Sequence, residues 1–370
     1  MNVEEQRERL DHWYGTLKNL QQDHADTQKS QIEANFSEIT DPEMKKLYEL
    51  LTVRYYLMCE DLERAAVALA ETGPEADKYH WLNYYYDFFR GIYHYERKEY
   101  KLAIDYYNKA RLFISDIPIE ETAELYYKLA SACNRIYQIS RSIKYAERAL
   151  EIFKDKALYK RMADCENLLG VNNQDVQQFK EAEQRYQDAL IHVKKARDEI
   201  LEIRILHNLG VLYSDQNKSE KSLEFLNRVY DFINTEKNQF HDEYLRSQSL
   251  YLLAVNHFKI DQSQKAREVL ESGIGLSKAT KNLTYFHRFN LLKAKFLEPS
   301  QFKEVYQKGI SYYRENKRWQ LVVEYGEELA SYFRGTGEHK EAAEYFHLAA
   351  EARNQIKKKR MVSDDEKIFI

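Results

Sequence analysis

Small residues recur through this chain at a nearly fixed interval, and this periodicity constrains the fold more than any other sequence feature. Ala130, Gly170 and Gly210 follow one another at equal spacing, and each is followed at fixed positions by three further residues, of which two are usually small and one usually bulky. Small residues at fixed helical positions let two helices approach closely, so the pattern predicts a series of packed helix pairs. The pattern occurs in these stretches: Gly91, Ala103, Tyr107 and Ala110; Ala130, Ser142, Ala146 and Ala149; Gly170, Ala182, Tyr186 and Ala189; Gly210, Ser222, Leu226 and Val229; Ala254, Ala266, Leu270 and Gly273; Ala330, Ala342, Phe346 and Ala349.

This spacing is typical of tetratricopeptide units, whose period of about 34 residues is slightly exceeded here. A single helix pair cannot bury its apolar face, so successive pairs must stack into a superhelix with a concave groove. We therefore expect an all-α protein in which about seven helix pairs over residues 78–356 form a right-handed superhelix. One unit, at about 284–314, keeps only the helical pattern of apolar residues and lacks the small residues.

The residues before this array predict an N-terminal three-helix bundle over 1–72. Leu10, Trp13 and Leu17 share one face of a first helix, and a second helix is expected at about 26–39. The third begins at Asp41-Pro42, because Asp caps free backbone N–H groups and Pro suits the first helical position. Residues 357–370 are expected to form a charged tail.

Composition narrows the possible functions. The net charge of −4 gives no basis for binding nucleic acid, which needs clustered cations. The three cysteines have no CxxC spacing and no phosphate-binding or catalytic motif appears, so we expect neither metal nor cofactor. The charged N-terminus lacks the apolar region of a signal peptide, and no stretch is long and apolar enough to span a membrane. A cytoplasmic location is expected.

Polar residues on the first helix of several units are candidates for binding a short peptide. Counting Gly210 as the eighth position, Arg204 and Asn208 point into the groove, and the preceding unit places Asn172 and Asp175 there. His257 is packed or lines the groove in its own unit. An Asn amide matches one peptide unit, whereas a carboxylate selects a basic side chain. The alternative is that these side chains only bridge neighbouring helices.

Several stretches resemble the Rap family of Bacillus quorum-sensing regulators over nearly the whole chain. The segment Tyr84–Tyr93, with Ala103-Ile104 after it, is similar to the family's Tyr-Tyr-Phe and Phe-Phe-Arg-Gly-Met-Tyr. Tyr145–Phe153 is a second match, and Trp13-Tyr14 and Arg54 are further ones. The resemblance implies the same domain order, a helical bundle followed by tetratricopeptide repeats.

By implication, the groove binds a short, re-imported Phr-type signalling peptide. Asp175 matches the family's peptide-binding Asp, and Asn208 matches its peptide-binding Asn, at the family's separation. The bundle is implied to dock a protein partner, with Asp41, Glu43 and Arg54 as candidate docking residues.

The sequence departs from the family's phosphatases at one place. Phosphatase members carry a Gln at the start of the third bundle helix, implied to orient water for attack on a response regulator's aspartyl phosphate. Here that position falls on Pro42 or Glu43, and the family's His after Arg54 is Tyr55. Proline has no side-chain hydrogen bond, and a carboxylate repels a phosphoryl group, so no catalytic residue is assigned.

Three hypotheses follow. The first is a peptide-controlled regulator that binds a transcription factor or repressor without catalysis. The second is a response regulator aspartate phosphatase that uses another residue. The third is a scaffold without a peptide ligand. Self-association into a homo-oligomer stays open in all three.

Overall fold

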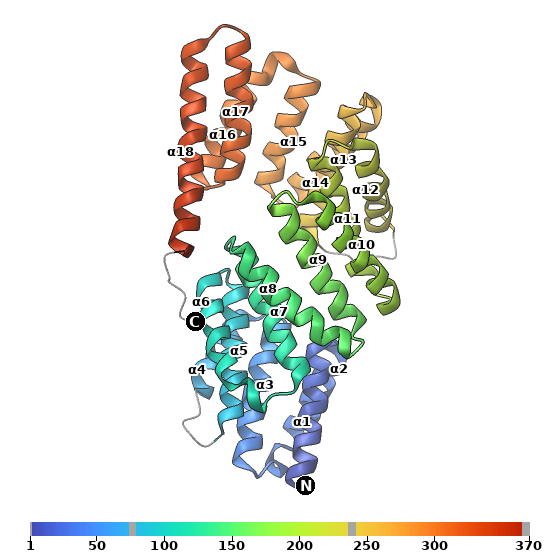
Figure 1. Ribbon diagram of the computed structural model, residues 1–370, viewed down its shortest axis with the longest axis vertical. Coiled ribbons are helices and arrows are strands. Elements are labelled where there is room, and N and C mark those ends of the chain that lie inside the picture. The colour runs from blue at the N-terminus through green and yellow to red at the C-terminus, as the bar shows by residue number, and fades with distance from the viewer. Residues whose placement is uncertain (1, 74–78, 236–241, 365–370) are drawn as a thin grey trace. The chain divides into compact units, whose positions relative to one another are not determined.

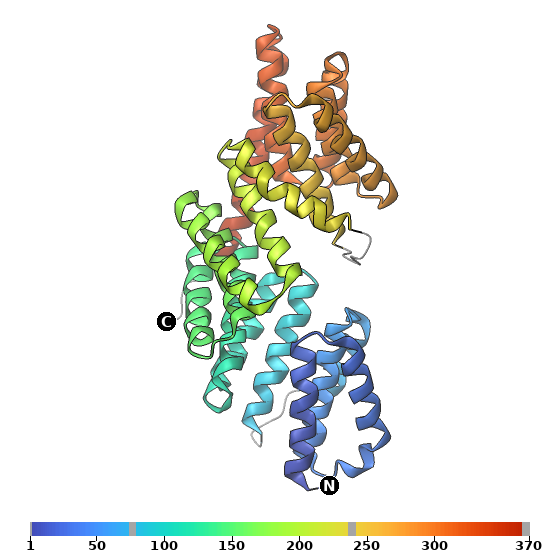
Figure 2. The same ribbon diagram turned by 90° about the vertical axis from the view of Figure 1, so that its right-hand side faces the viewer.

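The computed structural model describes residues 2–73, 79–235 and 242–364, with side chains up to residue 357, and every regular element in that part is a helix (Figures 1 and 2). The all-α prediction is therefore confirmed. The α-helices are α1 (Val3–Lys18), α2 (Gln22–Ala34), α3 (Pro42–Met58), α4 (Leu62–Thr72), α5 (His80–Glu96), α6 (Tyr100–Ala110), α7 (Ile119–Arg135), α8 (Ile139–Asp155), α9 (Tyr159–Asp175), α10 (Phe179–Ala196), α11 (Glu199–Asp215), α12 (Ser219–Ile233), α13 (Glu243–Lys259), α14 (Ser263–Ala279), α15 (Leu283–Phe296), α16 (Phe302–Glu315), α17 (Trp319–Gly335) and α18 (His339–Asp364).

The chain forms two compact units, residues 1–158 and 159–370. The first contains α1 to α8 and the second α9 to α18. This division falls between two helix pairs. The expected functional division at 72–78 stays a prediction, and residues 74–78 lie outside the described part.

Close helix contacts explain the spacing of the small residues. A Cβ atom added to Gly170 would lie 2.5 Å from the ring of Tyr186, and one added to Gly91 would lie 2.3 Å from the ring of Tyr107. Where the second small residue is a serine, it also binds the first: Ser222 Oγ donates to the Gly210 carbonyl at 2.7 Å. The repeated spacing is therefore that of paired helices in contact, as in tetratricopeptide units.

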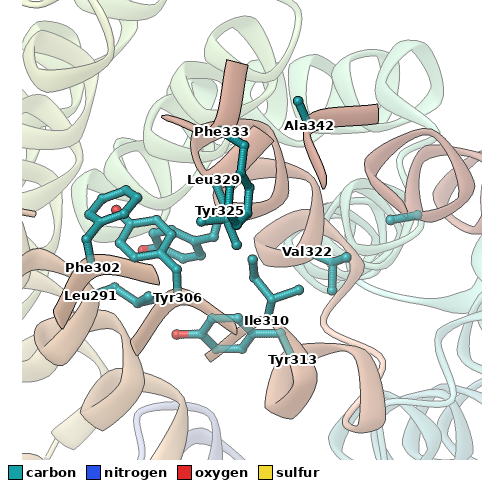
Figure 3. Packing of buried hydrophobic residues seen from close by; sticks show 11 residues of the cluster. Leu291, Phe302, Tyr306, Ile310, Tyr313, Val322, Tyr325, Leu329, Phe333 and Ala342 are labelled. Atoms are coloured by element: carbon teal, nitrogen blue, oxygen red, sulfur yellow. The ribbon is translucent and has the colours of Figure 1, made fainter. Parts of the chain in front are cut away.

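The unit at about 284–314, which lacks small residues at the positions where the other units carry them, keeps the same architecture by a reversed contact. Its helices are α15 and α16, and Gly309 of α16 packs against Leu291 of α15, where a Cβ atom added to Gly309 would lie 3.2 Å from the Leu291 side chain. Figure 3 shows Leu291 in the same apolar cluster as Tyr306, Tyr313 and Tyr325. In this unit, aromatic rings therefore make much of the helix packing that small residues make possible in the other units.

The N-terminal segment contains four α-helices, one more than the sequence analysis expected. The third expected helix ends at Met58, because Glu60 adopts a left-handed conformation with φ of 58°. Asp61 then caps a new helix by accepting from the Arg64 N–H at 3.0 Å. The second helix also differs from expectation, since it ends at Ala34 and a 3₁₀ turn, Phe36–Glu38, follows it.

The C-terminal end is more helical than expected. Helix α18 continues to Asp364, through the first half of the expected charged tail, and residues 365–370 lie outside the described part. None of the helices in the described ranges has the length and apolar character needed to cross a bilayer.

Candidate functional site

The first helices of three successive pairs, α9, α11 and α13, are joined by a row of polar side chains in the second unit. Asn208 Nδ2 donates to Asn167 Oδ1 at 2.9 Å, and Gln174 Nε2 donates to Asp215 Oδ2 at 2.7 Å. Between α11 and α13, Asn256 Nδ2 donates to Ser214 Oγ at 3.0 Å, and His207 Nδ1 and Ser249 Oγ share a hydrogen bond of 2.9 Å. We call these four pairs the polar ladder.

The two residues matched to the family's peptide site lie beside this ladder. Asp175 is the last residue of α9, is solvent-exposed and follows Gln174 directly. Asn208 is half-buried, and beyond its bond to Asn167 its amide oxygen and second N–H find no partner among the described residues. An Asn with an unused acceptor and donor has the capacity to bind one peptide unit of a ligand.

The other three expected binding residues are placed differently. Asn172 is 0% exposed, because it lies on the packed side of α9, so it reaches no ligand in this conformation. His257 is 5% exposed, and its Nδ1 contacts Gln262 Oε1 at 2.9 Å, so it holds the turn that leads into α14. Arg204 is exposed and lies 3.6 Å from Asp242, an ion pair open to solvent. Only Arg204 among these remains available on the surface.

Burial changes the ionisation of two groups in the ladder. Burial raises the pKa of Asp215, while the Gln174 hydrogen bond and then the charge of Lys259 oppose that rise. Burial also lowers the pKa of His207 to about 4, so the ring is neutral near pH 7. His207 Nε2 and Asn256 Oδ1 are buried without a partner in the described part of the structure. The ladder therefore retains hydrogen-bonding capacity after its own pairs have formed.

Asn167 and Gln174 were not predicted from the sequence. Each bonds to a residue 41 positions later, and the α11–α13 pairs are separated by 42. A search for polar pairs near that separation would have found them, because it is close to the spacing of equivalent positions in successive units, which is 40 residues from Gly170 to Gly210 and 44 from Gly210 to Ala254. Within the described residues, no group of three His, Cys, Asp or Glu side chains is arranged to hold a metal ion.

The candidate docking residues lie in the first unit, at and near the start of α3. Asp41 Oδ1 accepts from the N–H groups of Glu43 and Met44 at 2.9 and 3.1 Å, so it caps α3 as expected. The Glu43 carboxylate accepts a hydrogen bond from Trp81 Nε1 of α5, and Arg7 of α1 lies 4.3 Å from the same indole ring.

Arg54 differs from its neighbours at this site, because it is only 7% exposed. A guanidinium this buried contacts a partner only if α3 repacks. Asp41 and Glu43 are half-buried, so their outer atoms are accessible in the present conformation.

Comparison with known proteins supports the repeat assignment. A tetratricopeptide-repeat family model matches residues 161–234, which span α9 to α12. The apo form of RapI has a similar structure, with a TM-score of 0.77, 24% identity and coverage of 95% of this chain and 98% of that one. A Rap protein in complex with competence and sporulation factor gives a TM-score of 0.75, 21% identity and coverage of 97% and 100%.

Curated relatives match the chain over most of its length. Response regulator aspartate phosphatase I of Bacillus subtilis is 25% identical, covering 97% of this chain and 93% of the relative. Transcriptional activator NprA of Geobacillus stearothermophilus is 25% identical, covering 91% and 85%. The fold and its contacts define an all-α tetratricopeptide-repeat protein. The chain is homologous over nearly its full length to Rap proteins of Bacillus subtilis.

Proposed function

We propose that this chain is a peptide-regulated quorum-sensing regulator, and that the polar ladder with Asp175 and Asn208 binds the peptide. The observation that carries this proposal is the unused hydrogen-bonding capacity of Asn208 beside the exposed carboxylate of Asp175. Together these groups offer one contact to a peptide backbone and one to a basic side chain. Related proteins support the assignment, since a Rap protein was solved in complex with competence and sporulation factor.

The proposed target of the regulator is a transcription factor or repressor, bound without catalysis through residues 1–72. The start of α3 supports a docking role over a catalytic one. Pro42 has no side-chain hydrogen bond to offer, and the Glu43 carboxylate is held by Trp81. A negatively charged group at this place disfavours approach of an aspartyl phosphate.

The experiment is a capture of host proteins on the purified chain, with and without the peptide it binds best, followed by identification of the captured proteins. We expect a DNA-binding protein to be captured and then released by peptide. Asp175→Ala should capture the same protein but no longer release it. Capture that is insensitive to peptide in the unmodified chain would support the scaffold hypothesis instead.

The alternative is phosphatase activity, favoured by the similarity to response regulator aspartate phosphatase I. It is tested by incubating the chain with receiver domains labelled with phosphate on aspartate and following loss of the label. We expect no acceleration by the chain. Accelerated loss that peptide suppresses would replace the regulator proposal with this alternative and would require a catalytic residue other than Glu43.

A further inference from the structure

A second polar site lies on helices α13, α15 and α17 of the second unit. The guanidinium carbon of Arg288 is 3.9 Å from the ring centroid of Tyr251 and 5.4 Å from that of Tyr285. Arg288 Nε donates to the Tyr325 hydroxyl at 3.2 Å. Tyr251, Tyr285 and Tyr325 are buried, and Figure 3 shows Tyr325 within the apolar cluster of the C-terminal helices. The three rings therefore fix the position of the guanidinium.

This site has more hydrogen-bond donors than it uses. Arg288 is partly solvent-exposed, and in the described part of the chain no carboxylate forms a salt bridge with it. The hydroxyls of Tyr251 and Tyr325 lie 3.0 Å apart and share one hydrogen, so one phenolic hydrogen is left to donate elsewhere. Guanidinium N–H groups beside a phenol hydroxyl suit a ligand that only accepts hydrogen bonds, such as a carboxylate.

One carboxylate, that of Glu324, acts on Arg288, and in the described part of the chain it forms no salt bridge with Arg288. Glu328 is engaged by Lys295 at 2.7 Å and by the Tyr306 hydroxyl. Part of the Glu324 side chain reaches solvent. Burial raises the pKa of its carboxyl group, and the charge of Arg288 opposes this rise. The charges of Glu328 and then Asp215 add to the rise. The Glu324 carboxylate is thus near Arg288 and would repel a second carboxylate bound there.

The same contacts join this site to the polar ladder. The hydroxyls of Tyr251 of α13 and Tyr325 of α17 share a hydrogen bond. This bond skips one repeat unit, because α15 is the first helix of the unit between them. Asp215 of α11 likewise acts on Glu324 of α17, and Asp215 is itself bonded to Gln174, next to Asp175. Contacts from α9 through α11, and from α13 to α17, therefore connect the helices that carry Asp175 and the Arg288 site.

We propose that Arg288 binds the C-terminal carboxylate of the signalling peptide, which places the peptide's basic side chain toward Asp175. Every short unmodified peptide ends in a carboxylate, and the planar guanidinium fork can bind both of its oxygens. Three tyrosines hold the fork in place, so little side-chain freedom is lost on binding. This inference rests on the proposed function, because it assumes that these helices bind a peptide.

The test uses the full chain and two random pools of short peptides, identical except that one ends in a free carboxylate and the other in an amide. Peptides retained by the chain are identified, and the best is resynthesised in both forms for affinity measurements. We expect the amide to bind about 10- to 100-fold more weakly, the range for losing a charge-assisted hydrogen bond. This comparison needs no variant and so does not depend on how a substitution affects folding.

Variants then assign the effect to Arg288. Arg288→Gln should weaken binding of the acid form and bring the two forms to equal affinity. Glu324→Gln should strengthen binding of the acid form by removing a repelling charge and leave the amide form unchanged. Arg314→Gln, an exposed arginine of α16, is the matched control and should change neither affinity.

Each other outcome overturns the inference in a distinct way. If neither pool yields a bound peptide, the proposed function fails together with the inference. If peptides bind equally as acid and amide, the proposed function stands and the carboxylate site is wrong. If the acid preference survives Arg288→Gln, another residue binds the carboxylate. If Glu324→Gln weakens binding, the Arg288 site binds a cationic group instead.

Discussion

Polar side chains at the start of α3 in the first unit use their hydrogen-bonding groups within the chain, whereas the polar ladder of the second unit leaves some of these groups unused. Asp41 is committed to capping α3, and Glu43 accepts from Trp81. In the ladder, Asn208 retains an unused donor and acceptor after bonding to Asn167. Polar groups satisfied within the chain shape a surface, whereas polar groups with spare capacity on an accessible surface can bind a ligand. The contrast supports placing peptide recognition in the second unit, while the first unit presents a surface of fixed shape to the proposed protein partner.

The largest expected effect concerns the packing of the first unit. Trp13 is 0% exposed, its Nε1 donates to the Ala25 carbonyl at 3.2 Å, and its ring stacks 5.7 Å from Tyr48. Trp13→Ala should lower the free energy of unfolding of the first unit by about 3–5 kcal/mol. Urea denaturation monitored by circular dichroism measures this loss.

The control is Leu112→Ala in the same unit. Leu112 is 76% exposed, so its truncation should change the free energy of unfolding only slightly. Peptide affinity should survive Trp13→Ala under conditions in which both units stay folded. Loss of peptide binding in the folded variant would show that the first unit takes part in recognition and would break the contrast between the two regions.

Substitutions beside the ladder should give the reverse result. Asn208→Ala or Asp175→Ala should weaken peptide binding by about 1–3 kcal/mol, because a ligand amide or cation is left unpaired. Stability should change by less than about 1 kcal/mol, since neither side chain is fully buried. Calorimetric titration with the best peptide from the pools, beside thermal unfolding, measures both quantities.

Asp231→Ala, which removes an exposed carboxylate from α12, is the matched control for charge. A large loss of stability with unchanged affinity in Asn208→Ala would mean that Asn208 only bridges α9 and α11.

The sequence predicted helix pairing well because pairing depends on residue size at fixed positions. The contact of Gly170 with Tyr186 follows directly from the repeat. The break at Glu60 was missed because the left-handed turn uses a glutamate where glycine is the usual signal. Lys98, Gln177 and Asn217 adopt the same conformation between other helices, so the left-handed turns of this chain do not depend on Gly.

The exposure of the expected site residues depended on exact helical phase, which the sequence did not resolve. Asp175 and Asn172 are three residues apart on α9, yet one is exposed and the other is fully buried. Arg288 was missed because its unit lacks the small residues that number the positions of the other units. Its role depends on Tyr251 and Tyr325, which come from helices on either side of α15 and are remote in sequence.

A buried carboxylate of the first unit offers a pH test of the contrast. Glu121 is buried, accepts from the Tyr85 hydroxyl at 2.7 Å and lies 3.3 Å from Lys18 Nζ. Burial raises the pKa of Glu121 above its ordinary value of 4.5, although Lys18 and Tyr85 oppose the rise. The folded chain therefore binds this proton more tightly than the unfolded chain does, so stability from Glu121 falls as pH rises through the folded pKa.

Glu121→Gln removes this titration. The free energy of unfolding of the variant minus that of the unmodified chain should become more positive as pH rises from about 4.5 through the folded pKa of Glu121. Urea denaturation at a series of pH values measures the difference. A difference that becomes more negative with pH would mean that the Lys18 ion pair outweighs burial, and that the first unit gains from this charge.

The smallest expected effect tests whether the ladder orients Asn208, the proposed peptide-binding side chain. Asn167 accepts the hydrogen bond from Asn208 Nδ2, so Asn167→Ala frees the Asn208 amide to rotate without removing it. Peptide affinity should fall by about 0.5–1.5 kcal/mol, the net value of one hydrogen bond. In the double variant with Asn208→Ala the two losses should not add, because the orienting bond has no effect once Asn208 is absent. Additive losses would mean that Asn167 contacts the peptide independently, and the ladder would then be a row of separate contacts rather than a support for Asn208.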